Sequence, residues 1–259
     1  MFPTLLRIGE FRLATYGVVV AAGYLLGIWW LTRQREKMGL TEDDFWSLVY
    51  WLFAGALIGG KLLYLAVEWR ALFDGTLHPL RDIRYGFVFY GGVLGSMAFG
   101  TFWCRRRSQS FAKFADYFAV ALPLGHAVGR LACLTSGCCV GRPTSLPWAI
   151  RFTHPEALVD PALLGVPLHP VQAYESAADL AVTALALKVL GWVDAGKLRH
   201  GAGWAAYLAA YGVARFVLES FRGDDRGQGL LGLSPARALA IATTFGAVIY
   251  LARSRRAAA

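Results

Sequence analysis

The densest group of reactive side chains lies in one stretch, Gly129–Gly141, which reads GRLACLTSGCCVG. It places Arg130 ahead of Cys133, Cys138 and Cys139, in a chain that has four cysteines. Thiols so close in sequence can form a disulfide, ligate a metal, act as nucleophiles or pack as small apolar side chains. The choice depends on the solvent that this stretch meets, and therefore on the elements that carry it.

A second group of polar residues follows a helical spacing. Tyr211, Arg215, Glu219 and Arg222 are separated by four, four and three positions, which puts them on one face of a helix. If Arg130 and Arg215 converge from different helices, their two guanidinium forks suit a phosphate diester. Glu219 would hold Arg215 before substrate arrives; alternatively, the Arg215–Glu219 pair only ties helices together.

The composition points to a lipid environment for both groups. The chain has 259 residues, of which 56% are hydrophobic and 17% are charged, too apolar for an ordinary soluble domain. The first apolar run is too long for a secretory signal and lacks a cleavage site. The sequence therefore predicts an all-α membrane protein with about seven transmembrane helices. The expected spans are Leu13–Leu31, Phe45–Val67, Gly86–Cys104, Tyr117–Leu134, Ala173–Val193, Ala202–Phe221 and Pro235–Ala252.

Basic residues gather in alternate loops, which predicts an N-terminus outside and a C-terminus in the cytoplasm. These residues are Arg33, Arg35, Lys37, Arg105, Arg106, Arg107, Lys113, Lys197, Arg199, Arg253, Arg255 and Arg256. The net charge of +9 then reflects topology and contact with anionic lipid, and no nucleic-acid motif accompanies it. We expect one integral membrane domain over residues 1–259, with the proline-rich residues 135–170 as an outward-facing loop or cap.

Ionisable and tyrosine side chains inside the apolar runs fall at one expected depth, near the outer ends of their helices. They are Tyr16, Lys61, Tyr90, Arg130, Glu175, Arg215 and Glu219. Because a charge in hydrocarbon is costly, a shared depth indicates a site. Glycines in GALIGGKLLY and YGGVLGSMAFG are spaced so that two helices can approach closely.

Several segments also carry a family resemblance, and they occur in the same order along the chain. They read ATYGVVVAAGYLLG, GGKLLY, YGGVLG, GR with Gly141 after it, HPVQAYE and YGVARFVLESFR. In these segments and in the number of spans, the chain resembles the bacterial prolipoprotein diacylglyceryl transferase family.

The resemblance implies a multi-pass enzyme of the bacterial cytoplasmic (inner) membrane. It would move a diacylglyceryl group from phosphatidylglycerol to the lipobox cysteine of a prolipoprotein, with no cofactor and no metal. Arg130 and Arg215 would hold the phosphate, Glu219 would orient Arg215, and Tyr16 would belong to the polar lining. The residues that would line or brace the site are His126, Gly141, His169, Gln172, Tyr174, Glu175, Tyr211 and Arg222.

The chain departs from the family pattern in the reaction centre. Tyr90 stands where the family has a histidine, and Cys133, Ser136 and Cys138 stand where it has two asparagines and a glutamate. A tyrosine can relay a proton but is a poor base at neutral pH. His126 would substitute for the lost imidazole or be an ordinary hydrogen-bonded helix histidine. The candidate catalytic residues are Tyr16, Tyr90, Cys133, Cys138, Arg215 and Glu219.

Four interpretations of the cysteines stay open at the level of sequence. The first is a disulfide between Cys133 and either Cys138 or Cys139. The second is a metal site that the thiols form with a histidine, although their spacing matches no common zinc pattern. The third is a thiol that accepts the lipid group in a two-step transfer, and the fourth is packing alone. The histidines considered are His126, His154 and His169. The changed centre also leaves two other functions open: transfer to a different acceptor, and lipid binding without catalysis.

Overall fold

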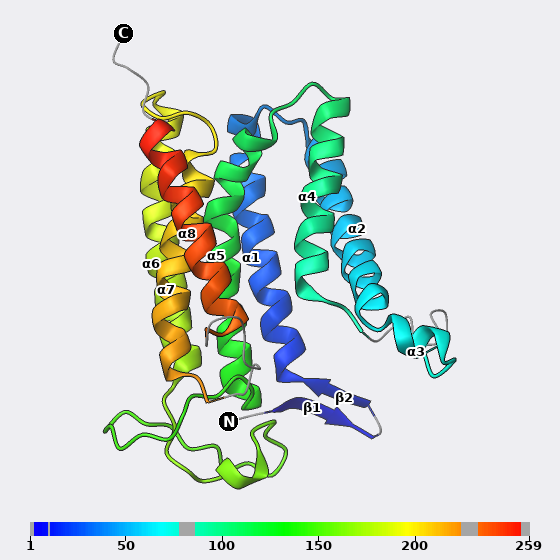
Figure 1. Cartoon of the computed structure of the whole chain (residues 1–259), viewed down its shortest axis with the longest axis vertical. Coiled ribbons are helices and arrows are strands. Elements are labelled where there is room, and N and C mark those ends of the chain that lie inside the picture. Colours follow the sequence, from blue (N-terminus) through cyan, green and yellow to red (C-terminus); the bar gives the residue numbers. More distant parts are fainter. Residues whose placement is uncertain (1–2, 10, 78–85, 224–232, 255–259) are drawn as a thin grey trace. The chain divides into compact units, whose positions relative to one another are not determined.

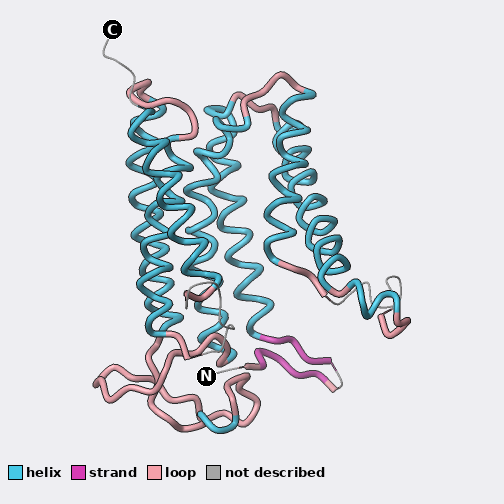
Figure 2. Tube along the Cα trace, in the orientation of Figure 1, coloured by secondary structure: helices cyan, strands magenta, loops and turns pink. Residues whose placement is uncertain are grey.

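The computed structural model describes residues 3–9, 11–77, 86–223 and 233–254. Each predicted apolar segment forms a helix (Figures 1 and 2). These helices are α1 (Thr15–Met38), α2 (Glu42–Val67), α4 (Phe89–Arg106), α5 (Phe111–Ser136), α6 (Val171–Asp194), α7 (Ala202–Leu218) and α8 (Pro235–Ser254). The prediction of an all-α membrane protein is thereby supported.

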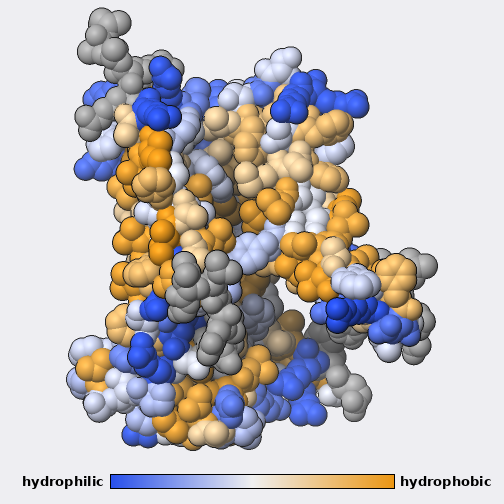
Figure 3. Space-filling view, in the orientation of Figure 1, coloured by the Kyte–Doolittle hydropathy of each residue, from blue (hydrophilic) through white to orange (hydrophobic). Residues whose placement is uncertain are grey.

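Of the helices in the described ranges, five are long and apolar enough to cross a membrane: α1, α2, α5, α6 and α8. The seven-span count and the orientation therefore remain predictions, and Arg255 and Arg256, which contributed to the orientation, lie outside the described residues. On the face shown in Figure 3, hydrophobic residues cover the flanks of the helices and hydrophilic residues gather toward their ends.

The chain begins with a short hairpin that the sequence analysis did not predict. Strand β1 (Thr4–Ile8) pairs antiparallel with β2 (Phe11–Ala14), with Leu6 opposite Leu13. The first helix therefore starts at Thr15 and not at Leu13. Leu13 is apolar enough to extend the hydrophobic run, but it pairs with Leu6 in the hairpin, so the helix begins after it. The shorter remaining elements are α3 (Trp69–Phe73) and the 3₁₀ turns η1 (Pro161–Leu163) and η2 (Glu219–Phe221).

The fold divides into two compact units. The first contains Met1–Arg33 and Ala115–Ala259, and the second contains Gln34–Phe114. Thus α6, α7, α8 and most of α1 and α5 belong to the first unit, and α2 and α4 belong to the second. The expectation of a single membrane domain stays a prediction.

Glycines form the contact between α2 and α4 in the second unit, as their spacing predicted. A Cβ on Gly55 would lie 2.5 Å from the carbonyl oxygen of Gly95, and Gly59 and Gly91 meet in the same way. At this distance the backbones themselves are in contact, and only glycine fits. Ser96 adds a hydrogen bond from its hydroxyl to the Leu52 carbonyl at 2.9 Å.

The helices of the first unit are joined by close approaches and polar contacts. A Cβ on Gly23 of α1 would lie 2.6 Å from the Gly125 carbonyl of α5, and Ser176 of α6 donates to the Ala127 carbonyl at 2.9 Å. Buried Asp116 of α5 accepts the backbone N–H of Gly201 at 2.8 Å. This contact satisfies a free N–H where α7 begins, so it fixes the start of the helix that carries Arg215.

The proline-rich loop between α5 and α6 folds over a small hydrophobic core of its own. Val140, Phe152, Val159 and Leu168 are buried there together. The Leu168 backbone exchanges hydrogen bonds with Ile150 at 2.8 and 3.0 Å. The loop is therefore an ordered cap in the first unit, and it holds the segments that lead into the site.

Candidate functional site

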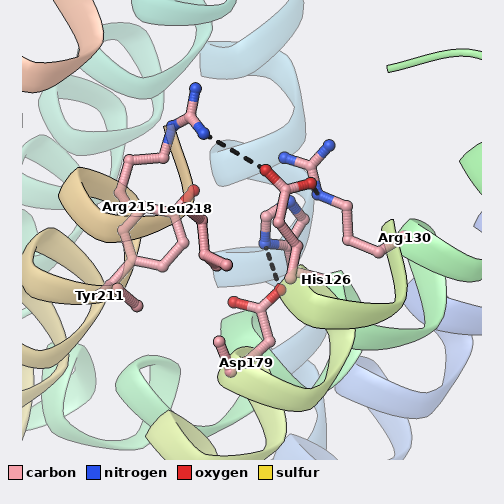
Figure 4. Close-up of a pocket in the computed structure, with 9 residues that line it drawn as sticks. His126, Arg130, Asp179, Tyr211, Arg215 and Leu218 are labelled. Carbon is pink, nitrogen blue, oxygen red and sulfur yellow. Dashed lines mark hydrogen bonds and ion pairs between the residues drawn. The ribbon is translucent and has the colours of Figure 1, made fainter. Parts of the chain in front are cut away.

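Glu175, in the second turn of α6, is the centre of a buried ion cluster. Its Oε2 lies 3.1 Å from Arg130 Nε, and its Oε1 lies 3.3 Å from Arg215 Nη1 and 3.0 Å from Arg222 Nη1. The Glu175 side chain is 5% exposed, so its ion pairs with the arginines are almost completely shielded from solvent. Figure 4 shows that Arg130 and Arg215, from different helices, turn toward one another, as their expected shared depth implied.

The helix face predicted for Tyr211, Arg215, Glu219 and Arg222 ends early. Helix α7 stops at Leu218, and η2 follows, so Arg222 lies in extended backbone beyond both. Arg222 nevertheless reaches Glu175, because its strand-like segment pairs with Gly141 and turns back toward the cluster. The convergence thus depends on a loop contact that helical spacing does not contain.

Glu219 contacts the second arginine, as the four-residue spacing predicted. Its Oε2 lies 2.5 Å from Arg215 Nη2, and its Oε1 accepts a hydrogen bond from Ser234 Oγ at 2.9 Å. Arg215 is therefore held between two carboxylates. Arg130 Nε and Arg215 Nη2 are in ion-pair contact, yet neither makes a hydrogen bond of good geometry to a described partner.

A small cavity opens beside this cluster and holds a histidine–aspartate pair. His126 Nδ1 lies 2.9 Å from Asp179 Oδ2 (Figure 4). The cavity is lined by His126, Arg130, Glu175, Ala178, Asp179, Tyr211, Ala214, Arg215 and Leu218. Asp179 was not among the predicted site residues, although an aspartate four residues after Glu175 in an apolar helix is a signal of a polar site.

The ion cluster around Glu175 contains more basic than acidic groups. The guanidinium groups of Arg130, Arg215 and Arg222 face the two carboxylates of Glu175 and Glu219. The one guanidinium group in excess complements the single negative charge of a phosphate diester.

An apolar groove begins where the polar cavity ends. It runs between α6, α7 and α8, and it shares Ala178 and Ala214 with the cavity. Alanines and larger aliphatic residues such as Leu185 and Val213 line it. A polar pocket continuous with an apolar groove matches the two parts of a phospholipid.

The three cysteines of the signature stretch meet in space. The Sγ atoms of Cys133, Cys138 and Cys139 all lie within 4.8 Å of one another. All four cysteines of the chain are free thiols, so the structure contains no disulfide of the kind considered from the sequence. The pKa of Cys139 is lowered by hydrogen bonds from the Cys133 and Cys138 thiols, with a smaller contribution from the neighbouring Arg222 guanidinium.

Several predicted site residues brace the loop instead of lining the cavity. Gly141 lies against His169: a Cβ at this position would be 2.6 Å from the His169 Cβ. Gln172 is fully buried and donates to the Cys138 carbonyl at 2.8 Å. The Tyr174 hydroxyl accepts the Trp148 indole N–H at 2.6 Å. The HPVQAYE segment therefore supports the site mainly through the loop.

The two tyrosines proposed for the reaction centre differ in their position. Tyr16 lies in the first turn of α1, and it is close enough to Arg130 and to the three clustered thiols to interact with them electrostatically. Tyr90 lies at the start of α4 in the second unit. The structure therefore groups Tyr16 with the thiols, and the contribution of Tyr90 stays a prediction.

Comparisons with known proteins agree on one family. The family model described as prolipoprotein diacylglyceryl transferase matches residues 3–253. Proteins named phosphatidylglycerol–prolipoprotein diacylglyceryl transferase are similar over most of their length. The protein from Clostridium tetani is 30% identical and shares 88% of each chain. Those from Idiomarina loihiensis and Rhodospirillum rubrum are 30% and 31% identical, over 98% of this chain and 93% of theirs.

Proposed function

The chain belongs to the prolipoprotein diacylglyceryl transferase family, and from this premise we propose that it transfers a diacylglyceryl group from phosphatidylglycerol to the lipobox cysteine of a prolipoprotein. The observation that carries the proposal is the meeting of Arg130 and Arg215 at the end of an apolar groove. A soluble phosphate ester would need the first feature but not the second.

The donor phosphate would bind to Arg130 and Arg215, exchanging with the Glu175 and Glu219 carboxylates for their hydrogen bonds. Its acyl chains would lie in the groove between α6, α7 and α8. The small alanine side chains along the groove support this, because they leave room for hydrocarbon beside the helices. Glu175 and Glu219 are then positioning residues that keep the guanidinium groups oriented before the lipid enters.

In the reaction, the acceptor sulfur attacks the glyceryl carbon that is bonded to a phosphate oxygen. A C–S bond forms, the C–O bond breaks, and glycerol phosphate leaves with the bonding electrons. The two arginines favour this step because they stabilise the charge that develops on the phosphate. The His126–Asp179 pair is our candidate for accepting the thiol proton, since the carboxylate fixes Nδ1 and leaves Nε2 available.

The direct test uses purified protein with labelled phosphatidylglycerol and a lipobox peptide. Each charged hydrogen bond contributes about 1.5–3 kcal/mol, so Arg215→Ala should lower transfer by roughly 10- to 100-fold or more. Arg215→Lys should rescue it poorly, because an ammonium group cannot form the bidentate fork. Arg33→Ala is the matched control, because it removes an arginine of α1 that does not line the cavity. Full transfer by Arg215→Ala would refute the phosphate clamp.

The second candidate function is transfer of the lipid group to a different acceptor. It is favoured by Tyr90, Cys133 and Cys138, which differ from the residues that the family pattern has at these positions. The same assay distinguishes the two functions. Thioether on the peptide supports the first function. Release of labelled glycerol phosphate without peptide modification supports the second. Absence of both products, with lipid still bound, would indicate lipid binding without catalysis.

The proposed reaction also requires a particular membrane orientation, with the cap on the outer face of the cytoplasmic membrane. The distribution of basic loops supports this orientation. Reporter fusions after Leu40, Ser145 and Ala257 should report cytoplasm, outside and cytoplasm. An outside signal at Ala257 would contradict the predicted seven spans.

A further inference from the structure

We propose that Cys133, Cys138 and Cys139 form a three-thiolate site for Zn²⁺, and that the open fourth position of this ion binds the acceptor thiol. The first half stands on the thiol cluster alone, and the second half rests on the proposed transfer reaction. The family resemblance implied no metal, and metal ligation by these thiols stayed open as one interpretation although their spacing matches no common zinc motif. The three-dimensional arrangement gives a reason to revise that prediction.

The spacing of the sulfur atoms is close to that of a zinc–thiolate site. At a Zn–S distance of about 2.3 Å, ligands of trigonal or tetrahedral zinc are separated by about 3.8–4.0 Å. The three Sγ atoms here already lie within 4.8 Å of one another. The sulfur atoms are therefore at most about 1 Å farther apart than zinc ligation requires.

The backbone of the stretch fixes the three thiols in this arrangement. Cys133 is in the last turn of α5, and the N–H groups of Gly137 and Cys138 bond to its carbonyl at 3.0 and 3.2 Å. The chain then passes through left-handed conformations at Gly137 (φ 75°) and Cys139 (φ 56°). Such a conformation is uncommon for a cysteine, and the buried Gln172 holds this segment through the Cys138 carbonyl.

The number of ligands distinguishes a reactive site from a structural one. Structural zinc sites are closed by four protein ligands, whereas catalytic sites have three and leave a position open. Within the described ranges, the group of ligand atoms contains the three thiols and no histidine or carboxylate. The Arg222 guanidinium lies beside Cys139, so the proposed site would adjoin the cationic cluster.

The site lies next to the arginine that would hold the donor. Arg130 and Cys133 are three residues apart on α5, about 4.5 Å along the helix axis, so they lie on neighbouring parts of one face. A thiol bound at the ion would therefore approach the phosphate-bearing end of the donor. This position matches the chemical need, since the sulfur must reach the carbon next to the phosphate.

Coordination to the ion would activate the acceptor. An acceptor thiol that binds the fourth position would lose its proton to solvent water, because a coordinated thiol is deprotonated, so this route would not need His126 as the proton acceptor. The resulting thiolate attacks the glyceryl carbon, the C–O bond breaks, and the phosphate leaves with the electron pair. The neutral thioether is a weak ligand, so the product would dissociate and leave the trithiolate site as it began. This route accounts for a centre in which cysteines stand where the family has other polar residues.

The first experiment measures metal binding by the full-length protein, reduced and purified in detergent. After incubation with Zn²⁺ and removal of the excess, we expect one zinc per chain by elemental analysis. Co²⁺ in its place should give thiolate-to-metal charge-transfer absorption. Cys139→Ser should lose both signals, and Cys104→Ser, which changes the buried thiol at the end of α4, should keep them. Retention of zinc by Cys139→Ser, or zinc below a tenth of an equivalent in the wild type, would overturn the site.

The second experiment tests the open position. Adding a lipobox peptide to the Co²⁺ form should shift the absorption spectrum, and the same peptide with serine in place of cysteine should not. Arg215→Ala should lose lipid transfer and keep this shift, and His126→Gln should also keep it, so failure of the transferase proposal is distinguishable from failure of the metal proposal. An unchanged spectrum with the cysteine peptide would restrict the ion to a structural function and refute the activation.

Reduced and unreduced samples must also be compared by intact mass and thiol alkylation. In the proposed state, all three thiols become alkylated once zinc is removed by a chelator. If Cys133 and one partner resist alkylation until a reductant is added, the cluster is a disulfide pair and the metal proposal is wrong.

Discussion

The two units of this protein differ in the groups that meet at their main helix contacts. In the second unit, α2 and α4 meet through glycines, with Gly55 and Gly59 of one helix against Gly91 and Gly95 of the other. In the first unit, α5, α6 and α7 meet around a buried carboxylate and three arginines. The first arrangement depends on the absence of side chains, and the second depends on charged side chains that compensate one another.

The difference shows that the buried charged side chains of this protein, whose desolvation is unfavourable, gather in the first unit. Glycine contacts need no polar groups, since apolar helices in lipid associate through close packing. A buried ion cluster stabilises less than its contacts suggest, because each charge first loses its solvation. Retaining Glu175 among three arginines is therefore better explained by a site that must receive an anion than by stability alone.

The largest expected effect comes from removing the shared carboxylate. Glu175→Ala leaves three guanidinium groups facing one another with one fewer counter-charge, and breaking a buried ion pair costs about 3–5 kcal/mol. We expect a clear fall in the thermal unfolding midpoint in detergent, together with loss of lipid transfer. Glu175→Gln keeps the shape and should show the charge effect by itself. If Glu175→Ala unfolds like the wild type, the cluster is not the hub of the first unit.

A smaller effect is expected in the glycine contact. Gly55→Leu would force α2 away from α4, because even a Cβ there would be 2.5 Å from the Gly95 carbonyl. Overpacking of this kind costs about 1–3 kcal/mol. Gly246→Ala in α8, where a Cβ meets nothing within 4 Å, should leave the unfolding midpoint unchanged or slightly higher. Equal destabilisation by both variants would contradict the close backbone contact.

The smallest effect is expected for an exposed ion pair. Comparing it with the buried pairs of Glu175 shows how much of the effect on stability is due to burial and how much to charge. Arg12 Nη2 lies 2.5 Å from Glu156 Oε2, and these side chains are 46% and 41% exposed. Exposed pairs contribute about 0–1 kcal/mol, so Glu156→Gln should shift the midpoint little, and added salt should remove the difference. A loss comparable to that of Glu175→Gln would mean that solvent exposure does not explain the contrast.

Particular residues show how far sequence reasoning reached. The spacing of Arg215 and Glu219 predicted their contact, because neighbours on one helix turn are set by local geometry. The contact region of Arg130 and Arg215 was expected because both residues were predicted to lie at the same depth in the membrane. That depth follows from the position of each residue within its apolar segment. Arg222 was assigned to the correct group for an incomplete reason: it arrives through a loop pairing with Gly141, and no helical period contains that contact.

The sequence by itself determined the solvent, the helical segments and the residue types available for chemistry. Apolar length and periodicity depend only on near neighbours in the chain, so they can be read directly. Tertiary structure alone decided that Glu175 would be shared by three arginines, that Asp179 would face His126, and that three cysteines would meet within 4.8 Å. These contacts depend on how α5 and α6 pack and on how the chain turns after α5, and both are set by the packing of the whole unit.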